Sequence, residues 1–309
     1  MDGTASLPEG SDQLPLPMRR ALERARVCQP RGSGLIYTLL PSRLLGLTLD
    51  AVVMRDSFAV RYNYPTLHAA TETCTADRCG LPYTLEHALQ CRHGSNIHQR
   101  HNAPLRVLQE IAQTALGDPR NSKGTVKWEP IIRSDAEAAE TAARARAAAQ
   151  PRDQVREVKA LKGDLAIKGL VQHGNGILII DGRCTFPDGQ AAQQKAAKDI
   201  LADHEKEKRA KHQAACEVKH MTFLPAVWTT CGAKGNAFIK LVDMLSIRLA
   251  ERWGRGKGRC KAWINARLAI AFAKATSACI RNVRGSLSEA ANAMPCYDGA
   301  EIAGGVIRF

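Results

Sequence analysis

Apolar and polar positions alternate along the chain with two different periods, which predict a mixture of helices and strands. In Pro104–Leu116 apolar residues recur three and four positions apart, the period of an amphipathic helix. The segment GDLAIKGL alternates loosely, whereas GILIID is a continuous apolar run, typical of a strand buried on both faces. Because the turn residues QHGNG separate these two segments, we expect a hairpin.

Further elements are predicted on both sides of this hairpin. Asp50 is well placed to cap a helix in AVVMRDSFAVRY. The segments TVKWEPII and FLPAVWTT have the composition of strands. Other helices are expected at Gln190–Val218, Gly235–Trp253 and Cys260–Arg281. This order predicts an α/β fold with a two-layer or three-layer core.

Composition divides the chain into four parts and one insertion. Ser134–Arg152 contains nine alanines and no large aliphatic residue, so we expect a solvated helix or a loosely ordered insertion there. The expected parts are a flexible tail at 1–33, a helical linker with a Cys/His cluster at 34–103, an α/β domain at 104–285 with the insertion at 134–160, and a C-terminal tail at 286–309.

The overall composition is that of a globular protein, with 45% hydrophobic and 24% charged residues. No apolar run is long enough to span a bilayer, and no secretory signal is visible, so we expect an intracellular or nuclear protein without membrane contact. The net charge of +14 points toward polyanionic partners rather than a small-molecule substrate.

Positive charge is densest near the C-terminal end. From Arg248 to Arg284 there are ten Lys and Arg residues and one acid, Glu251. Such a density is typical of phosphate-backbone binding, although a solvated surface is the alternative. The candidate nucleic-acid-binding residues are Arg252, Arg255, Lys257, Arg259 and Lys261.

A cluster of Cys and His residues has the spacing of a structural zinc site. The candidate ligands are Cys74, Cys79, His87 and Cys91. Two short-spaced pairs joined by a turn are the usual way to bring four soft ligands into a tetrahedron. The alternative is that the cysteines are core thiols and the histidines are surface residues.

Two carboxylates form the second candidate site. Asp164 opens the first hairpin strand and Asp181 ends the second, so we expect both to face one cleft, with Arg183 beside them. Glu129 is a possible third carboxylate on a neighbouring strand. Such a group can hold catalytic Mg²⁺ or Mn²⁺, which activates water and stabilises charge on a phosphate. Ordinary turn chemistry is the alternative for aspartates at strand ends.

Taken in order, the strings CGLPYTLEHALQCRHG, RHN, WEP, KGDLAIKG, IIDGRC and EKEKRAKH resemble the C-terminal region of polyproteins from non-LTR retrotransposons. These elements end in a CCHC zinc knuckle and a restriction-like endonuclease. The upstream LLPSRLLGLTLDAVVMRDSFAVRY is similar to their linker, and LAERWGRGKG is similar to their tail. The resemblance covers about residues 34–285.

The resemblance implies a restriction-endonuclease-like mixed sheet flanked by helices. Asp164 matches the aspartate of a basic-Pro-Asp motif, with Lys162 as the basic residue, and Asp181 matches the second acid of PD-(D/E)xK nucleases. Two positions depart from the pattern, since Gly163 replaces proline and Arg183 replaces lysine. Arginine cannot be deprotonated, so we expect it to act electrostatically, or Lys195 or Lys198 to replace the lysine.

Three functions follow as hypotheses. The first is a metal-dependent endonuclease that nicks DNA, with DNA and element RNA as partners and structural Zn²⁺ as a cofactor. The second is a catalytically dead, zinc-containing nucleic-acid-binding relic, and the third is a zinc-stabilised interaction module. No Tyr-x-Asp-Asp string is present, so we expect no reverse transcription and interpret the chain as a truncated or domesticated fragment.

Overall fold

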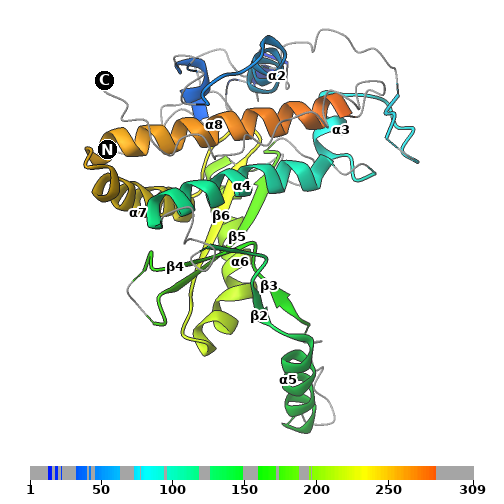
Figure 1. Ribbon diagram of the computed structural model, residues 1–309. Coiled ribbons are helices and arrows are strands. Elements are labelled where there is room, and N and C mark those ends of the chain that lie inside the picture. Colours follow the sequence, from blue (N-terminus) through cyan, green and yellow to red (C-terminus); the bar gives the residue numbers. More distant parts are fainter. Residues whose placement is uncertain are drawn as a thin grey trace.

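A four-stranded mixed sheet lies at the centre of the computed structural model (Figure 1). Its strands are β1 (Val126–Trp128), β4 (Leu165–Lys168), β5 (Ile177–Thr185) and β6 (Thr222–Thr229), in that spatial order. The first two pairings are antiparallel and the β5–β6 pairing is parallel. The predicted hairpin and the α/β class are therefore confirmed.

The structure describes most of the chain between residues 33 and 282. Residues 286–309 and nearly all of the expected tail at 1–33 lie outside the described residues, as do 149–158 of the expected insertion. The described ranges are 13–15, 18–19, 22, 33–39, 42, 46–62, 73–76, 78–93, 96–117, 126–148, 159–171, 174–187, 195 and 197–282.

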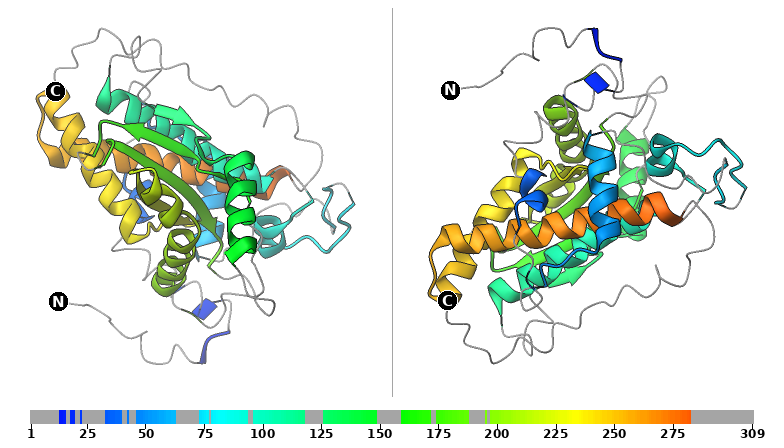
Figure 2. Two further views of the ribbon diagram at one scale, coloured as in Figure 1. Left: turned by 90° about the horizontal axis from the view of Figure 1, so that it is seen from below. Right: turned by 90° about the horizontal axis from the view of Figure 1, so that it is seen from above.

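Helices cover both faces of the sheet (Figure 2). One face packs against α4 (Asn96–Leu116), α7 (Asn236–Trp253) and α8 (Lys257–Asn282), and the other against α6 (Ala197–Val218). Alternate residues of β5 point to opposite faces, so Leu178 and Ile180 join the first core while Ile179 joins the second. Each of these three side chains is at most 1% exposed, which confirms a strand buried on both faces.

The N-terminal elements pack along α8, the longest helix. They are η3 (Ser33–Tyr37), α2 (Ala51–Tyr62) and α3 (Leu85–Gln90). The backbone N–H of Val53 donates to Asp50 Oδ1 over 2.7 Å, so the predicted helix cap is confirmed. Asp56 is only 2% exposed and accepts hydrogen bonds from both Nε and an Nη atom of Arg281, at 2.7 and 2.9 Å. This ion pair joins α2 to the far end of α8.

The expected strand TVKWEPII divides into two strands that belong to different sheets. Glu129 has a φ of +47°, which turns the chain between β1 and β2 (Ile131–Arg133). A small second sheet pairs β2 with β3 (Leu161–Lys162).

The Ala-rich insertion begins with a solvated helix, one of its two expected forms. This helix, α5 (Asp135–Ala148), extends away from the sheet (Figure 1). A capping box starts it, because Ser134 N–H donates to the Glu137 carboxylate while Glu137 N–H donates to Ser134 Oγ. Lys219, just after α6, pairs with Glu137 at 2.8 Å and ties the base of the helix to the domain.

We expect Asp56→Ala to destabilise the fold by about 3 kcal/mol, because breaking a buried ion pair leaves a charged partner uncompensated. Urea unfolding followed by circular dichroism measures this change. Glu140→Ala is the matched control, since Glu140 pairs with Arg144 on an exposed helix surface. Equal stability losses in the two variants would contradict a structural role for the Asp56–Arg281 pair.

Candidate functional site

Four donor atoms of the predicted zinc ligands lie within 4.8 Å of one another. Cys91 Sγ is 3.8 Å from both Cys74 Sγ and Cys79 Sγ, and Cys79 Sγ is 3.3 Å from His87 Nε2. Zn–S bonds of about 2.3 Å at tetrahedral angles place two sulfurs about 3.8 Å apart. The predicted convergence is confirmed, and the cluster can hold a metal ion such as zinc.

The local backbone explains why these four ligands meet. Cys74 N–H donates to Leu81 O over 2.7 Å, which closes a short loop around the first cysteine pair. Gly80 has a φ of +63°, a conformation that suits glycine, and turns the chain after Cys79. Thr84 then caps α3 by accepting from His87 N–H. Helix α3 therefore starts at a defined residue, and it carries His87 within it and Cys91 directly after it.

The two cysteines of the first pair lie in different electrostatic environments. Burial raises the pKa of the Cys74 thiol to about 12, whereas the backbone N–H of Leu81 lowers the pKa of Cys79. Without a cation, the buried Cys74 thiol is therefore protonated at neutral pH. A bound Zn²⁺ would hold both groups as thiolates, so we expect metal binding to release protons.

Asp164 lies just before β4, and its carboxylate is held from the α4 side of the sheet. It accepts from the backbone N–H of Gly182, and His101 Nε2 of α4 lies 3.3 Å from it. Burial alone would lower the pKa of His101, but the Asp164 carboxylate outweighs burial and the net shift is upward. His101 is therefore a partner of Asp164, and it is not in the zinc cluster.

Asp181 is held from the opposite face, by α6. Lys208 Nζ forms an ion pair with Asp181 Oδ2, and His212 Nε2 lies 3.3 Å from the same oxygen. Burial raises the pKa of Asp181, but His212 and the Lys208 charge outweigh it and lower the net value. His212 is fully buried, and its ring stacks on Phe223 with centroids 5.1 Å apart.

Other polar side chains of β5, beyond Asp181, also contact α6. Because β5 extends to Thr185 instead of ending at Asp181, residues 181, 183 and 185 point to the same face. Arg183 donates to Glu207 over 2.6 Å, and Thr185 Oγ1 lies 2.9 Å from His204 Nδ1. Arg183 is therefore engaged in an ion pair.

Asp164 and Asp181 have their partners on different helices, and the expectation that both face one cleft stays a prediction. Asp164 precedes the first residue of β4, so strand alternation does not set the direction of its side chain. Glu129 is exposed, and among the described residues only the zinc cluster gathers three or more potential metal ligands. Asp164, Asp181 and Glu129 therefore do not form such a group of three ligands among the described residues.

Gly163 stands where the resembled motif has proline, and the structure explains the glycine. A Cβ atom at this position would lie 2.7 Å from Ile179 Cγ2. The Gly163 N–H also donates to Pro130 O over 3.0 Å, a bond that proline cannot make. The backbone at this position therefore accommodates glycine and not proline.

The expected lysines do not lie at the acids. Lys195 forms an ion pair with Asp203 at 2.5 Å, and Lys198 is exposed. Sequence reasoning missed Lys208 and His212, which lie four positions apart in α6. That spacing places both on one helix face, and it is the only signal that could have indicated them.

The five candidate nucleic-acid contacts divide into two groups. Arg252 donates to the carbonyl oxygens of Thr114 and Gly117 at the end of α4, and Lys261 pairs with Asp243 at 2.6 Å. These two side chains connect helices, and their part in nucleic-acid binding stays a prediction. The other three are exposed at the turn between α7 and α8, and we call them the basic turn: Arg255, Lys257 and Arg259.

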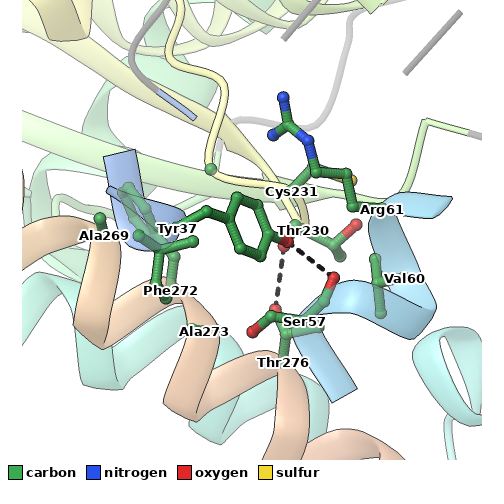
Figure 3. Close-up of a pocket in the computed structure, with 12 residues that line it drawn as sticks. Tyr37, Ser57, Val60, Arg61, Thr230, Cys231, Ala269, Phe272, Ala273 and Thr276 are labelled. Carbon is green, nitrogen blue, oxygen red and sulfur yellow. Dashed lines mark hydrogen bonds between the residues drawn. The ribbon is translucent and has the colours of Figure 1, made fainter. Parts of the chain in front are cut away.

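A cavity between η3, α2, α8 and the loop after β6 is too small to be a ligand site (Figure 3). Its volume is about 30 Å³, far below the roughly 300 Å³ of typical ligand pockets. Across it, Thr276 Oγ1 donates to Thr230 O over 3.1 Å, and Tyr37 Oη donates to Ser57 O over 2.9 Å. We regard it as a packing defect where the linker meets the domain.

No protein-family model matches the chain, and no curated protein sequence shows significant similarity to it. No helix among the described residues is long and apolar enough to cross a bilayer. The chemistry of the candidate sites is therefore inferred from their residues alone.

Replacing Cys79 with serine should abolish stoichiometric zinc binding and unfold the loop around the cluster, because structural zinc contributes folding energy directly. Zinc content is measured by chelator titration after gel filtration, with Co²⁺ absorption as an independent report of thiolate ligands. Cys184→Ser is the matched control, because Cys184 lies in β5 outside the cluster. Retention of one zinc per chain by Cys79→Ser would contradict the ligand assignment.

Proposed function

We propose that the chain is a zinc-containing nucleic-acid-binding protein related to the C-terminal region of non-LTR retrotransposon polyproteins, and that it binds without cutting. One observation carries this proposal: the Cys/His cluster and the basic turn are fixed at opposite ends of α8. Tyr83 Oη, beside the cluster, donates to Ile280 O over 3.0 Å, near the last residue of α8. The basic turn includes the first residues of the same helix.

The charges of the basic turn support a binding role. The first turn of α8 contains no acid, although acids stabilise helix N-termini. Lys257 and Arg259 therefore oppose the helix dipole, and helix stability does not account for them. Positive side chains at the N-terminus of a helix are suited to phosphate oxygens.

We further infer that the sheet is the restriction-endonuclease-like core implied by the resemblance. The mixed four-stranded sheet with helices on both faces supports this inference. Loss of cutting is supported by the contacts of the acids. Asp164 pairs toward α4 and Asp181 toward α6, so each carboxylate already has a partner from a different face.

A DNA-nicking activity is the second candidate, because one observation favours it. Lys208 of α6 lies beside Asp181 and could replace the lysine that nucleases of the resembled group have at the position of Arg183. Unlike Arg183, a lysine can lose its proton, and it therefore restores a group that the sequence alone lacks at this position.

Reversing the charges of the basic turn should weaken binding to duplex DNA of any sequence. In Arg255→Glu, Lys257→Glu, Arg259→Glu, the slope of log affinity against log salt should flatten by about one for each lost phosphate contact. Fluorescence anisotropy over a salt series measures both quantities. Arg144→Glu, on the exposed surface of α5, is the control and should leave the slope unchanged. An unchanged slope in the triple variant would contradict the proposal.

Purified protein should not nick supercoiled plasmid with Mg²⁺ or Mn²⁺ above the level of an Asp164→Ala, Asp181→Ala double variant. Agarose gels that resolve supercoiled from nicked plasmid measure this over time. Nicking by the wild type that disappears in Asp181→Ala and in Lys208→Met would contradict the proposal and establish the second candidate.

A further inference from the structure

Three aromatic rings from two elements gather on the outer surface of the linker. They belong to Tyr37 of η3 and to Phe58 and Tyr62 of α2, and we call them the aromatic platform. Ring centroids are 4.6 Å apart for Tyr37–Phe58 and 5.9 Å apart for Phe58–Tyr62, with the latter pair stacked. Phe58 is 37% and Tyr62 is 42% exposed. Tyr37 is half-buried, so two of the three rings are exposed, in a chain with only 5% aromatic residues.

Contacts within the linker hold the rings of the aromatic platform in place. Arg61 is buried, and its guanidinium lies 5.3 Å from the Tyr37 ring centroid and 5.7 Å from that of Tyr62. The hydroxyl of Tyr37 donates to Ser57 O over 2.9 Å, which ties η3 to α2 (Figure 3). The rings are therefore ordered before any partner binds, which reduces the entropy cost of binding.

The charges around the platform are positive. Arg55 is exposed one helical turn before Phe58, on the same side of α2. The only acid within α2 is Asp56, and its carboxylate is buried against Arg281. Figure 2, viewed from above, shows α2 lying across the outer side of α8, and Arg55, Phe58 and Tyr62 of α2 are exposed.

We propose that the aromatic platform is a binding site for single-stranded nucleic acid, on which one or two bases stack. Every base has a π-face, so stacked aromatic rings bind single strands with little sequence preference. The exposed Arg55 attracts the phosphate backbone of the nucleic acid. The buried Arg61 holds the tyrosine rings in place by cation–π interactions. This site is separate from the basic turn, which contacts duplex phosphates in the proposed function.

The test uses the full zinc-loaded chain and two fluorescein-labelled probes, a thymidine single strand of about 12 nucleotides and a duplex of the same length. Phe58→Leu and Tyr62→Leu keep apolar bulk but remove the stacking face. Each should weaken single-strand binding about tenfold at moderate salt and leave duplex binding unchanged. Phe58→Trp should restore single-strand binding.

Val52→Ala is the matched control, because Val52 is 37% exposed on the same helix and lies outside the platform. Wild-type single-strand affinity in both leucine variants would overturn the proposal. Equal weakening toward both probes would also overturn it, because the bases of a duplex are not open to stacking. Failure of the basic-turn variants to weaken duplex binding would refute the proposed function without affecting this result.

Discussion

Burial of strand β5 on both faces is the constraint on which the rest of the structure depends. Its apolar half builds two cores at once, and its second half carries polar side chains, which are buried at Asp181 and half-buried at Arg183 and Thr185. A buried polar group is costly unless it is paired, so Asp181 in particular needs a partner from a neighbouring helix. Helix α6 provides Lys208, Glu207 and His204 in register with the strand. The pairing of β5 with β6 then holds this register through Thr185.

The same constraint governs where the two aspartates of the predicted acidic site find their partners. Side chains that meet a metal must be left with free lone pairs in a shared space. Here the strand continues beyond Asp181, and Asp164 lies in the bend before β4. The two carboxylates thereby contact helices on different sides of the sheet, Asp164 at α4 and Asp181 at α6.

Local features were predictable from the sequence, whereas features that depend on distant partners were not. The hairpin, the Asp50 cap and the four zinc ligands each depend on residues close in sequence, and all three were predicted. The bend at Glu129 was missed because a positive φ in a non-glycine residue has no composition signal. The basic C-terminal segment looked almost uniformly charged because its acidic partners, Glu110 and Asp243 among them, lie in other helices. Lys208 and His212 were hidden in a helix whose charges suggested ordinary surface pairing.

The ion pair between Asp56 and Arg281 has a consequence for how the chain is made. Its two residues are separated by 225 positions, so α2 is synthesised long before its partner exists. At about 5–20 residues per second, this delay on the ribosome is roughly 10–45 s. During that interval the carboxylate has no arginine, and the apolar side of α2 has no α8 to cover it. Helix α2 can therefore dock only after α8 has been translated, although it is made much earlier.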